Sequence, residues 1–451
     1  MIETPTIITR RRRPASGIAP EFTFSEDHIP NFSDDKAIIE YRQQAWQAFQ
    51  ALPMPLTTDE PWRRTDIHTL QSDRFQLAGL NSTDGKEKVP AQLLKPLAGK
   101  SHGGQIILSA SCAAKSISEN LEKQGVVFTD LKTAEEKHPG LLAKVMGKVV
   151  SPNEGKFAAL AAALSRTGIL LYVPRHVQID TPLHSLLWGQ GTGLAYLSHI
   201  LVYLEEGASV TYVHESASPE AEAGQIMHAG IVELFVGREA HLGFVELQSW
   251  GQNVWNFSHE RARIEQDGSI DWIFGAIGSR LTKNFSELSL AGRGAVGKMS
   301  GFYFTNNQQH LDHDTQQNHL APHTTSDLLF KGALLDESRS VWQGMIYVAP
   351  DAVKTDGYQA NRNIVLSRNA RADSIPGLEI LADDVRCTHG ATVGKIDPEL
   401  VFYLTSRGIP EKEAEKLVVQ GFFDPIMQRI PFEGVRDRFQ AAITKKMKTI
   451  I

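Results

Sequence analysis

The chain of 451 residues contains very few cysteines. Cys112 and Cys387 are the two, which is too few for a disulfide framework and too few to hold zinc or an iron–sulfur cluster by thiolates alone. We interpret Cys112 as a packing residue. Any metal chemistry of this chain therefore needs other ligand types or ligands from another chain.

Long apolar runs and an excess of positive charge are also lacking. No stretch approaches the ~20 apolar residues of a membrane helix, so we expect a cytoplasmic protein with no membrane partner. Lys plus Arg total 46 against 52 Asp plus Glu, a formal charge of −6, which argues against a nucleic-acid partner. Arg10 to Arg13 are followed by Pro14 rather than by the apolar segment of an export signal, and residues 1–30 are therefore interpreted as a disordered arm.

Nucleotide-binding loops are absent from the sequence. Gly292-Arg293-Gly294 has neither the Gly-Lys-Ser/Thr of an ATPase loop nor the third glycine of a dinucleotide loop. We therefore do not expect the chain to hydrolyse ATP.

Residues 31–165 predict a mixed domain of helices with short strands. Ser33 can cap a helix whose apolar residues, from Ile38 to Leu52, follow three- and four-residue steps. A second helical stretch spans 141–164 and is interrupted at Gly147 and Pro152.

Residues 166–390 form a long block in which β-branched and alternating runs replace helical periodicity. Similar turn signals recur at intervals of roughly 25 to 35 residues. They are Glu206-Gly207-Ala208, Arg238-Glu239-Ala240, Asp267-Gly268-Ser269 and Arg293-Gly294-Ala295. A solenoid grows by stacking coils, so the block favours a parallel β-helix, with a large β-sandwich as the alternative.

Residues 391–451 predict a helical C-terminal domain. One short helix begins at Pro398 and closes at Gly408, and a second runs from Pro410 to Gly421. A third amphipathic helix spans 435–447.

The most polar part of the β block lies between residues 306 and 323. Imidazole and carboxylate side chains at alternate positions of a strand point to one face and could ligate a metal. Stacked hydrogen-bonded ladders are the alternative, and no established metal-binding spacing is present. The residues concerned are His310, Asp312, His313, Asp314, His319 and His323.

A second group of candidate residues lies where the β block meets the C-terminal helices. Cys387 and His389 are two residues apart, so in a strand both side chains point the same way. A buried cysteine beside a hydrogen-bonded histidine is one interpretation. Half of a metal site that another chain completes is the second, and a Cys–His nucleophile oriented by Asp383 or Asp384 is the third.

Several segments together resemble the SufB/SufD family of iron–sulfur cluster assembly proteins, most densely from about residue 300 to 423. The Cys-Thr-His-Gly form at 387–390 is most similar to the SufD branch, because the SufB branch has acidic residues beside the histidine. The segments are Pro322-His323-Thr324-Thr325-Ser326-Asp327, Val341-Trp342-Gln343-Gly344, Lys354-Thr355-Asp356-Gly357-Tyr358-Gln359, Ile375-Pro376-Gly377-Leu378-Glu379-Ile380, Cys387-Thr388-His389-Gly390-Ala391-Thr392 and Phe402-Tyr403-Leu404-Thr405-Ser406-Arg407-Gly408-Ile409.

This resemblance implies a mainly β protein, a right-handed parallel β-helix between an N-terminal α/β domain and C-terminal helices. It implies a non-catalytic scaffold that pairs with a SufB-like paralogue and with a SufC-like ATPase, and it allows a homodimer when the chain is alone. A nascent iron–sulfur cluster would form transiently at the SufB–SufD contact, where His389 and Cys387 would contribute. The resemblance also allows a reduced flavin in the complex, for which no motif is visible, and none of these groups is expected in the isolated chain.

The ATPase contact implied by the resemblance falls on the C-terminal helices. Its candidate residues are Phe402, Leu417, Phe422 and Phe423. For Phe422 and Phe423, ordinary core packing is the competing interpretation.

Two other functions suit parts of the sequence. A β-helix polysaccharide-active enzyme would match the architecture, but the sequence offers no export signal and no convincing carboxylate pair. A metal-dependent hydrolase would use His310, Asp312, His313 and His319.

Overall fold

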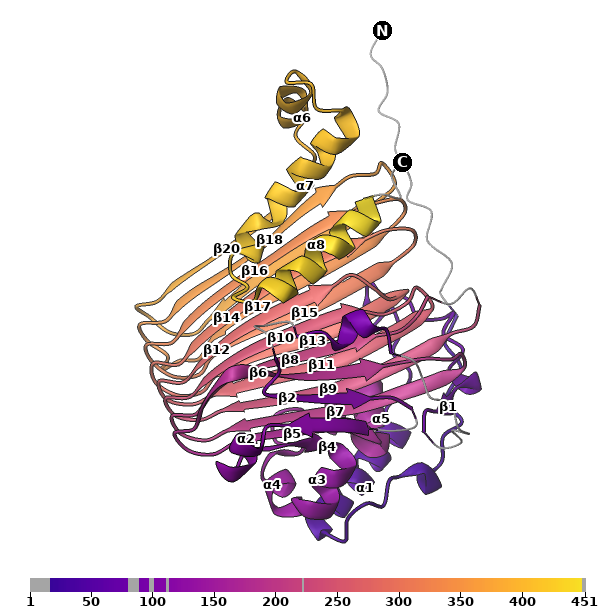
Figure 1. Cartoon of the computed structure of the whole chain (residues 1–451), viewed down its shortest axis with the longest axis vertical. Coiled ribbons are helices and arrows are strands. Elements are labelled where there is room, and N and C mark those ends of the chain that lie inside the picture. The colour runs from indigo at the N-terminus through magenta and orange to yellow at the C-terminus, as the bar shows by residue number, and fades with distance from the viewer. Residues whose placement is uncertain (1–16, 80–88, 97–100, 111–112, 221–222, 448–451) are drawn as a thin grey trace.

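The computed structural model describes residues 17–79, 89–96, 101–110, 113–220 and 223–447. Cys112 and most of the expected N-terminal arm lie outside these ranges. Two long sheets of parallel strands face each other through most of the molecule (Figure 1). From β5 onward, successive strands alternate between the two sheets, so that two strands make one coil of a parallel β-solenoid. The predicted parallel β-helix is confirmed.

The first sheet, called sheet A, has strands β4 (Val127–Asp130), β5 (Thr167–Val173), β7 (Leu194–Leu204), β9 (Ile226–Val236), β11 (Val254–Ile264), β13 (Leu281–Leu290), β15 (His310–His319), β17 (Arg339–Val348) and β19 (Arg371–Ile380), and β1 (Gln76–Leu77) pairs with β7. The second, sheet B, has β3 (Ala113–Ile117), β2 (Gly104–Leu108), β6 (Gln178–Trp188), β8 (Ser209–Ala217), β10 (His241–Ser249), β12 (Ser269–Ala276), β14 (Val296–Thr305), β16 (Thr325–Leu334), β18 (Asp356–Val365) and β20 (Arg386–Lys395).

The register of the strands gives the length of a coil. Trp255 pairs with Leu281, 26 residues later, and Arg339 pairs with Arg371, 32 residues later. These lengths agree with the recurrence of turn signals in the sequence. Each coil buries its apolar side chains between the two sheets and against neighbouring coils.

The recurring turn residues stack along one corner of the solenoid. Gly207, Glu239, Asp267 and Gly294 all have the left-handed backbone conformation, with φ between 53° and 74°. Each donates its backbone N–H to a carbonyl in the corresponding turn of the next coil, as from Glu239 to Gln266 at 2.9 Å. The same ladder continues through His323 and Lys354, whose N–H donates to the Asp384 carbonyl at 2.9 Å. A left-handed residue is therefore required once per coil.

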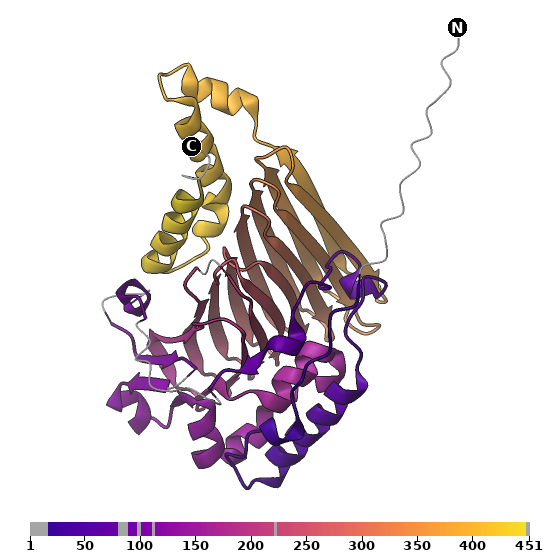
Figure 2. The same ribbon diagram turned by 90° about the vertical axis from the view of Figure 1, so that its right-hand side faces the viewer.

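Helices of the N-terminal part cover sheet A near the start of the solenoid (Figure 2). The helices of this part are α1 (Lys36–Ala51), α2 (Glu119–Lys123), α3 (Leu131–Lys137), α4 (Pro139–Val145) and α5 (Lys156–Leu164), with the short 3-10 helices η1 (Glu26–His28), η2 (Glu60–Trp62), η3 (Ser72–Arg74), η4 (Ala91–Leu94) and η5 (Pro152–Glu154). Of these, η4 packs on sheet B instead, and α2 packs on the cluster between the two sheets. The N-cap of α1 is Asp35, whose carboxylate accepts from the Ala37 N–H at 2.9 Å. The expectation that Ser33 caps this helix was wrong, because Ser33 instead accepts the N–H of Asp35 itself.

Three helices follow the last strand, namely α6 (Pro398–Thr405), α7 (Glu411–Met427) and α8 (Glu433–Met447). Helices α7 and α8 pack on the outer face of sheet B, as Figures 1 and 2 show. The expected end of α7 at Gly421 was wrong. Phe423 packs against Phe302 and Phe304 of the sheet, and this burial outweighs the roughly 1 kcal/mol cost of a glycine inside a helix.

Among the described helices, none is both long enough and apolar enough to cross a membrane.

Candidate functional site

Cys387 and His389 lie on β20, the last strand of sheet B. In the register of the sheet, Cys387 pairs with Gly357 and His389 pairs with Gln359. Gln359 is fully buried, whereas its neighbours Tyr358 and Ala360 belong to the cluster beneath the C-terminal helices. Side chains alternate along a strand, so Cys387 and His389 share the row that faces the inside of the solenoid.

The thiol of Cys387 lies at the edge of a small apolar cluster formed by Ile346, Val348 and Ala352. Burial raises the pKa of this thiol, the backbone N–H of Gly357 opposes the shift, and Asp356 adds to it. The thiol is therefore protonated at neutral pH until a metal or another electrophile displaces the proton.

Gly357 makes room beside the thiol. A Cβ at this position would come within 3.2 Å of Cys387 Sγ and 3.3 Å of His319 Nε2. His319 is held through both ring nitrogens, by Thr324 Oγ1 at 2.7 Å and Ser326 Oγ at 2.8 Å. Burial lowers the pKa of His319 to about 4, so this imidazole is neutral.

His389 itself is exposed. Beside it, Arg386 forms an ion pair with Asp356, and this hydrogen bond lowers the pKa of the Asp356 carboxyl. Asp384 sits at the coil corner, where its carboxylate pairs with Lys354 Nζ at 2.5 Å. The neighbourhood thus offers one thiol and one accessible imidazole as ligands for a metal.

Two ligands do not complete a metal site. Across the described part of the chain, no three His, Cys, Asp or Glu side chains are placed to hold a metal ion together. The missing ligands of a site at β20 would therefore have to come from outside the described residues.

The end of the solenoid next to this pair is open. In the described structure β19 and β20 each have a paired neighbour on one side only. Apolar side chains are exposed here, at 37% for Leu378, 52% for Leu381 and 49% for Val393. An unpaired strand edge with exposed apolar side chains is suited to contact with another protein.

The polar run between 306 and 323 is divided among several structural roles. Asp312 and Asp314 both pair with the buried amine of Lys283, at 3.0 and 2.9 Å. Burial nevertheless raises the pKa of Asp312 to about 6. His310 is bonded to Thr65 Oγ1 at 2.8 Å, and burial lowers its pKa to about 3.

The other three histidines of this run also have structural contacts, those of His319 being its bonds to Thr324 and Ser326. His313 is buried and stacks on Tyr303 with ring centroids 5.6 Å apart. His323 occupies a rung of the corner ladder. Contacts with neighbouring strands and segments therefore describe His310, Asp312 and Asp314 better than metal ligation, whereas both ring nitrogens of His313 lack a hydrogen-bond partner among the described residues. Lys283 and Thr65 could not be predicted from the sequence as partners of this run, because each belongs to a segment distant from it along the chain.

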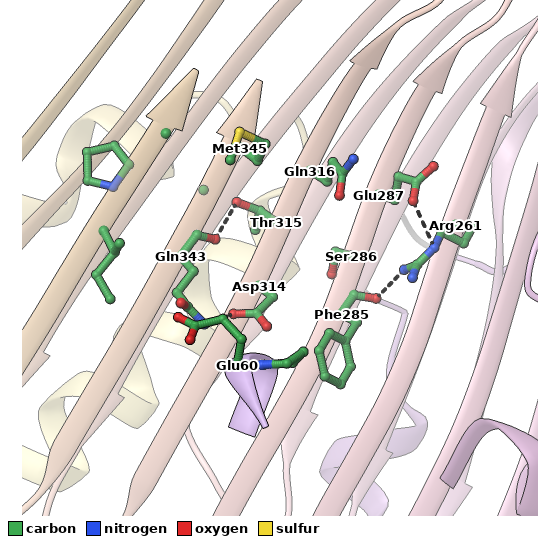
Figure 3. Close-up of a pocket in the computed structure, with 15 residues that line it drawn as sticks. Glu60, Arg261, Phe285, Ser286, Glu287, Asp314, Thr315, Gln316, Gln343 and Met345 are labelled. Carbon is green, nitrogen blue, oxygen red and sulfur yellow. Dashed lines mark hydrogen bonds and ion pairs between the residues drawn. The ribbon is translucent and has the colours of Figure 1, made fainter. Parts of the chain in front are cut away.

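An open groove of about 460 Å³ lies on the outer face of sheet A near this run (Figure 3). Its floor includes Asp314, Gln316 and Gln343, and Pro61 of η2 is at its rim. The charged groups are already engaged: Arg261 pairs with Glu287 at 3.1 Å, and Asp314 accepts from Gln343 at 2.7 Å (Figure 3). The groove contains no free constellation for catalysis.

The four candidate partner residues differ in exposure. Phe402 on α6 is 71% exposed and Leu417 on α7 is 39% exposed. Phe422 is half-buried, with its carbonyl accepting from Lys331 Nζ at 2.5 Å. Phe423 is fully buried against sheet B, so it reaches a partner only if α7 moves.

Comparison with known proteins identifies the family of this chain. Residues 187–422 match the SufBD core domain of the SUF iron–sulfur cluster assembly system, and residues 22–184 match the SufBD N-terminal region. The chain belongs to the SufBD family. An iron–sulfur cluster assembly SufBD family protein of Staphylococcus haemolyticus is 29% identical over 413 residues, covering 88% of this chain and 86% of the relative. One from Staphylococcus aureus is 30% identical over 321 residues, covering 70% and 68%.

Membership of the SufBD family places the protein in iron–sulfur cluster assembly. The core match runs from the end of β6 through most of α7 and so includes Cys387, His389 and Phe402.

Proposed function

We propose that this chain is a SufD-like, non-catalytic scaffold subunit that acts in the cytoplasm. In this role it pairs with a SufB-like paralogue at the open end of the solenoid and with a SufC-like ATPase through the C-terminal helices. The nascent iron–sulfur cluster is its cargo. The observation that carries the proposal is the placement of Cys387 and His389 side by side on the last strand, next to an unpaired edge.

The ligand chemistry supports a shared site. Thiolate and imidazole both ligate iron in iron–sulfur centres. Because the described residues supply two ligands at this place, the cluster would depend on the paralogue for the rest. Separation of the two chains would then break the ligand set, which suits a cluster that must be handed on.

The raised pKa of the Cys387 thiol makes iron binding at this residue depend on pH. Iron must displace the thiol proton, so binding at Cys387 releases a proton and strengthens as the pH rises. His389 is exposed and can bind iron through a neutral ring nitrogen.

The proposal is tested with His389→Ala in the complex co-expressed with its SUF partners. We expect iron and sulfide recovered with the complex to fall by about tenfold or more, since even loss of a ligand's supporting group costs 10- to 100-fold in metal affinity. Partner recovery should be unchanged, because the variant leaves intact the exposed apolar side chains of this end, such as Leu378 and Val393. His241→Ala, which changes an exposed histidine on β10, is the matched control. An unchanged cluster yield in His389→Ala would reject the shared site.

A further inference from the structure

A narrow polar chamber lies inside the solenoid, far from β20. It has a volume of about 20 Å³ and is lined by residues of β7, β8, β9, β10 and β11. The side chains around it belong to the rows that otherwise build the apolar core, such as those of Phe244 and Trp272. A space of this size accommodates one water molecule.

Two carboxyl groups meet in this chamber from opposite sheets. Glu246 comes from β10 of sheet B and Glu260 from β11 of sheet A. They are 9% and 0% exposed, and both line the chamber. A hydrogen bond between two carboxyl groups requires a proton on one of them.

The hydrogen bonds of the two carboxyl groups differ. Glu260 accepts from Asn284 Nδ2 at 2.6 Å and from Ser286 Oγ at 3.1 Å. These donors stabilise Glu260 as the carboxylate. Glu246 Oε2, in contrast, is buried without a hydrogen-bond partner among the described residues.

No positive charge from the surrounding strands compensates the pair. His214 of β8 is bonded to Ser185 and Ser216, and burial lowers its pKa to about 3. His228 of β9 is bonded to Ser198 and Asn256, and burial lowers its pKa to about 4. Both imidazoles are therefore neutral at physiological pH.

The remaining polar groups facing the pair are also neutral. They are Tyr212 of β8, whose pKa is raised mainly by burial, and Trp272 of β12. Two ionised carboxylates in such a place would repel each other in a medium of low polarity.

We propose that this chamber is a proton-binding site, in which Glu246 keeps a proton and donates it to the Glu260 carboxylate while one water molecule is bonded to Glu246 Oε2. The bound proton joins sheet A to sheet B in the middle of the solenoid. Burial raises the pKa of both groups, most strongly that of Glu246.

The bound proton determines how the stability of the folded chain changes with pH. An acid whose pKa is raised by folding binds a proton in the folded chain at a pH where the unfolded chain has lost it. Its contribution to stability is therefore lost as the pH rises towards the folded pKa. Each pH unit in this window changes the unfolding equilibrium constant by up to about tenfold.

The infrared spectrum of the full chain tests the proposal directly. At pH 7 we expect a carbonyl band from a protonated, buried carboxyl group, and Glu246→Gln should remove it. Glu239→Gln, which changes an exposed corner residue, should leave the band in place. Absence of the band in the unmodified chain, or its persistence in Glu246→Gln, would overturn the proposal.

Urea unfolding between pH 6 and 9 provides the second measurement. Glu246→Gln retains a hydrogen-bond donor towards Glu260 but cannot ionise, so its stability relative to the unmodified chain should increase as the pH rises. Parallel profiles for the two chains would contradict a bound proton. If Glu246→Gln does not fold, the infrared band of the unmodified chain decides alone.

Discussion

At the residue scale, Glu233 shows how one side chain fastens the N-terminal part to the solenoid. Its carboxylate is fully buried on β9. It accepts the backbone N–H groups of Gly147 at 2.7 Å, Val149 at 2.7 Å and Val150 at 3.1 Å. His199 Nε2 adds a contact of 2.8 Å. Three backbone N–H groups of the loop after α4 therefore depend on one acceptor.

Glu233→Gln should destabilise this junction by about 2 kcal/mol or more. The amide nitrogen of glutamine donates, so it must face at least one N–H group and leave it unsatisfied, and each such buried group costs about 1–3 kcal/mol. Hydrogen exchange should show faster exchange at the amides of Gly147, Val149 and Val150. Glu239→Gln serves as the exposed control. Unchanged protection of these three amides would show that the loop is held by packing instead.

At the scale of elements, α8 is held to sheet B by more than its apolar stripe. Phe439 packs edge-on against Phe302, with ring centroids 3.5 Å apart. Lys446 brings its amine to the carbonyl of Phe304 and lies 2.7 Å from Gln309 Oε1. Burial lowers the pKa of Lys446 to about 7. The helix thus carries an amine that loses its charge close to physiological pH.

Lys446→Met should change how stability depends on pH. A base whose pKa is lowered by folding holds fewer protons in the folded chain than in the unfolded one between pH 7 and 10. The free energy of unfolding therefore rises with pH in this window, by up to about 1.4 kcal/mol per unit. Methionine fills a similar volume without a charge, so its stability relative to the unmodified chain should fall between pH 7 and 9.

Urea unfolding of both chains at pH 7, 8 and 9 measures this difference. Lys412→Met, which changes an exposed lysine on α7, should leave the pH dependence unaltered. A constant difference between Lys446→Met and the unmodified chain across this range would show that the amine does not titrate there.

At the scale of the whole molecule, two separate surfaces are available to partners. One is the open end of the solenoid, where Leu378 and Val393 are exposed, and the other is the tip of the helical part around α6. Removing every residue after Gly408 would also uncover the apolar face of sheet B beneath α7 and α8. Point substitutions on exposed side chains therefore distinguish the two surfaces better than truncation.

Phe402→Asp should abolish capture of a SufC-like ATPase and leave pairing with the SufB-like paralogue intact. The ring is 71% exposed, so the substitution costs the isolated chain little, whereas a charge in an apolar contact is strongly unfavourable. Leu378→Asp is the reciprocal control and should weaken paralogue pairing alone. Pull-down of each variant with both partners is the measurement, and full ATPase capture by Phe402→Asp would remove α6 from the contact.

Features that repeat along the chain were predictable from the sequence, whereas contacts between residues of distant segments were not. Turn signals such as Asp267-Gly268 recur once per coil, and that recurrence indicated a solenoid. The position of Cys387 two residues before His389 indicated a shared face. The partnership of Glu246 with Glu260 was missed, because nothing in either strand shows which residue of the facing sheet it meets. The end of α7 was misjudged because burial of Phe423 outweighed the local signal of Gly421.

The packing of α7 and α8 on sheet B has a mechanical consequence. In a stack of coils each coil interacts with its neighbours, so a disturbance at one end fades along the stack. The two helices bypass this path, because Arg438 of α8 pairs with Glu215 on β8 while Arg429 after α7 pairs with Asp327 on β16 at 3.1 Å. The two helices therefore connect β8 and β16 directly across the coils between them. A force applied at α6 therefore reaches the middle of the solenoid directly, without being relayed from coil to coil.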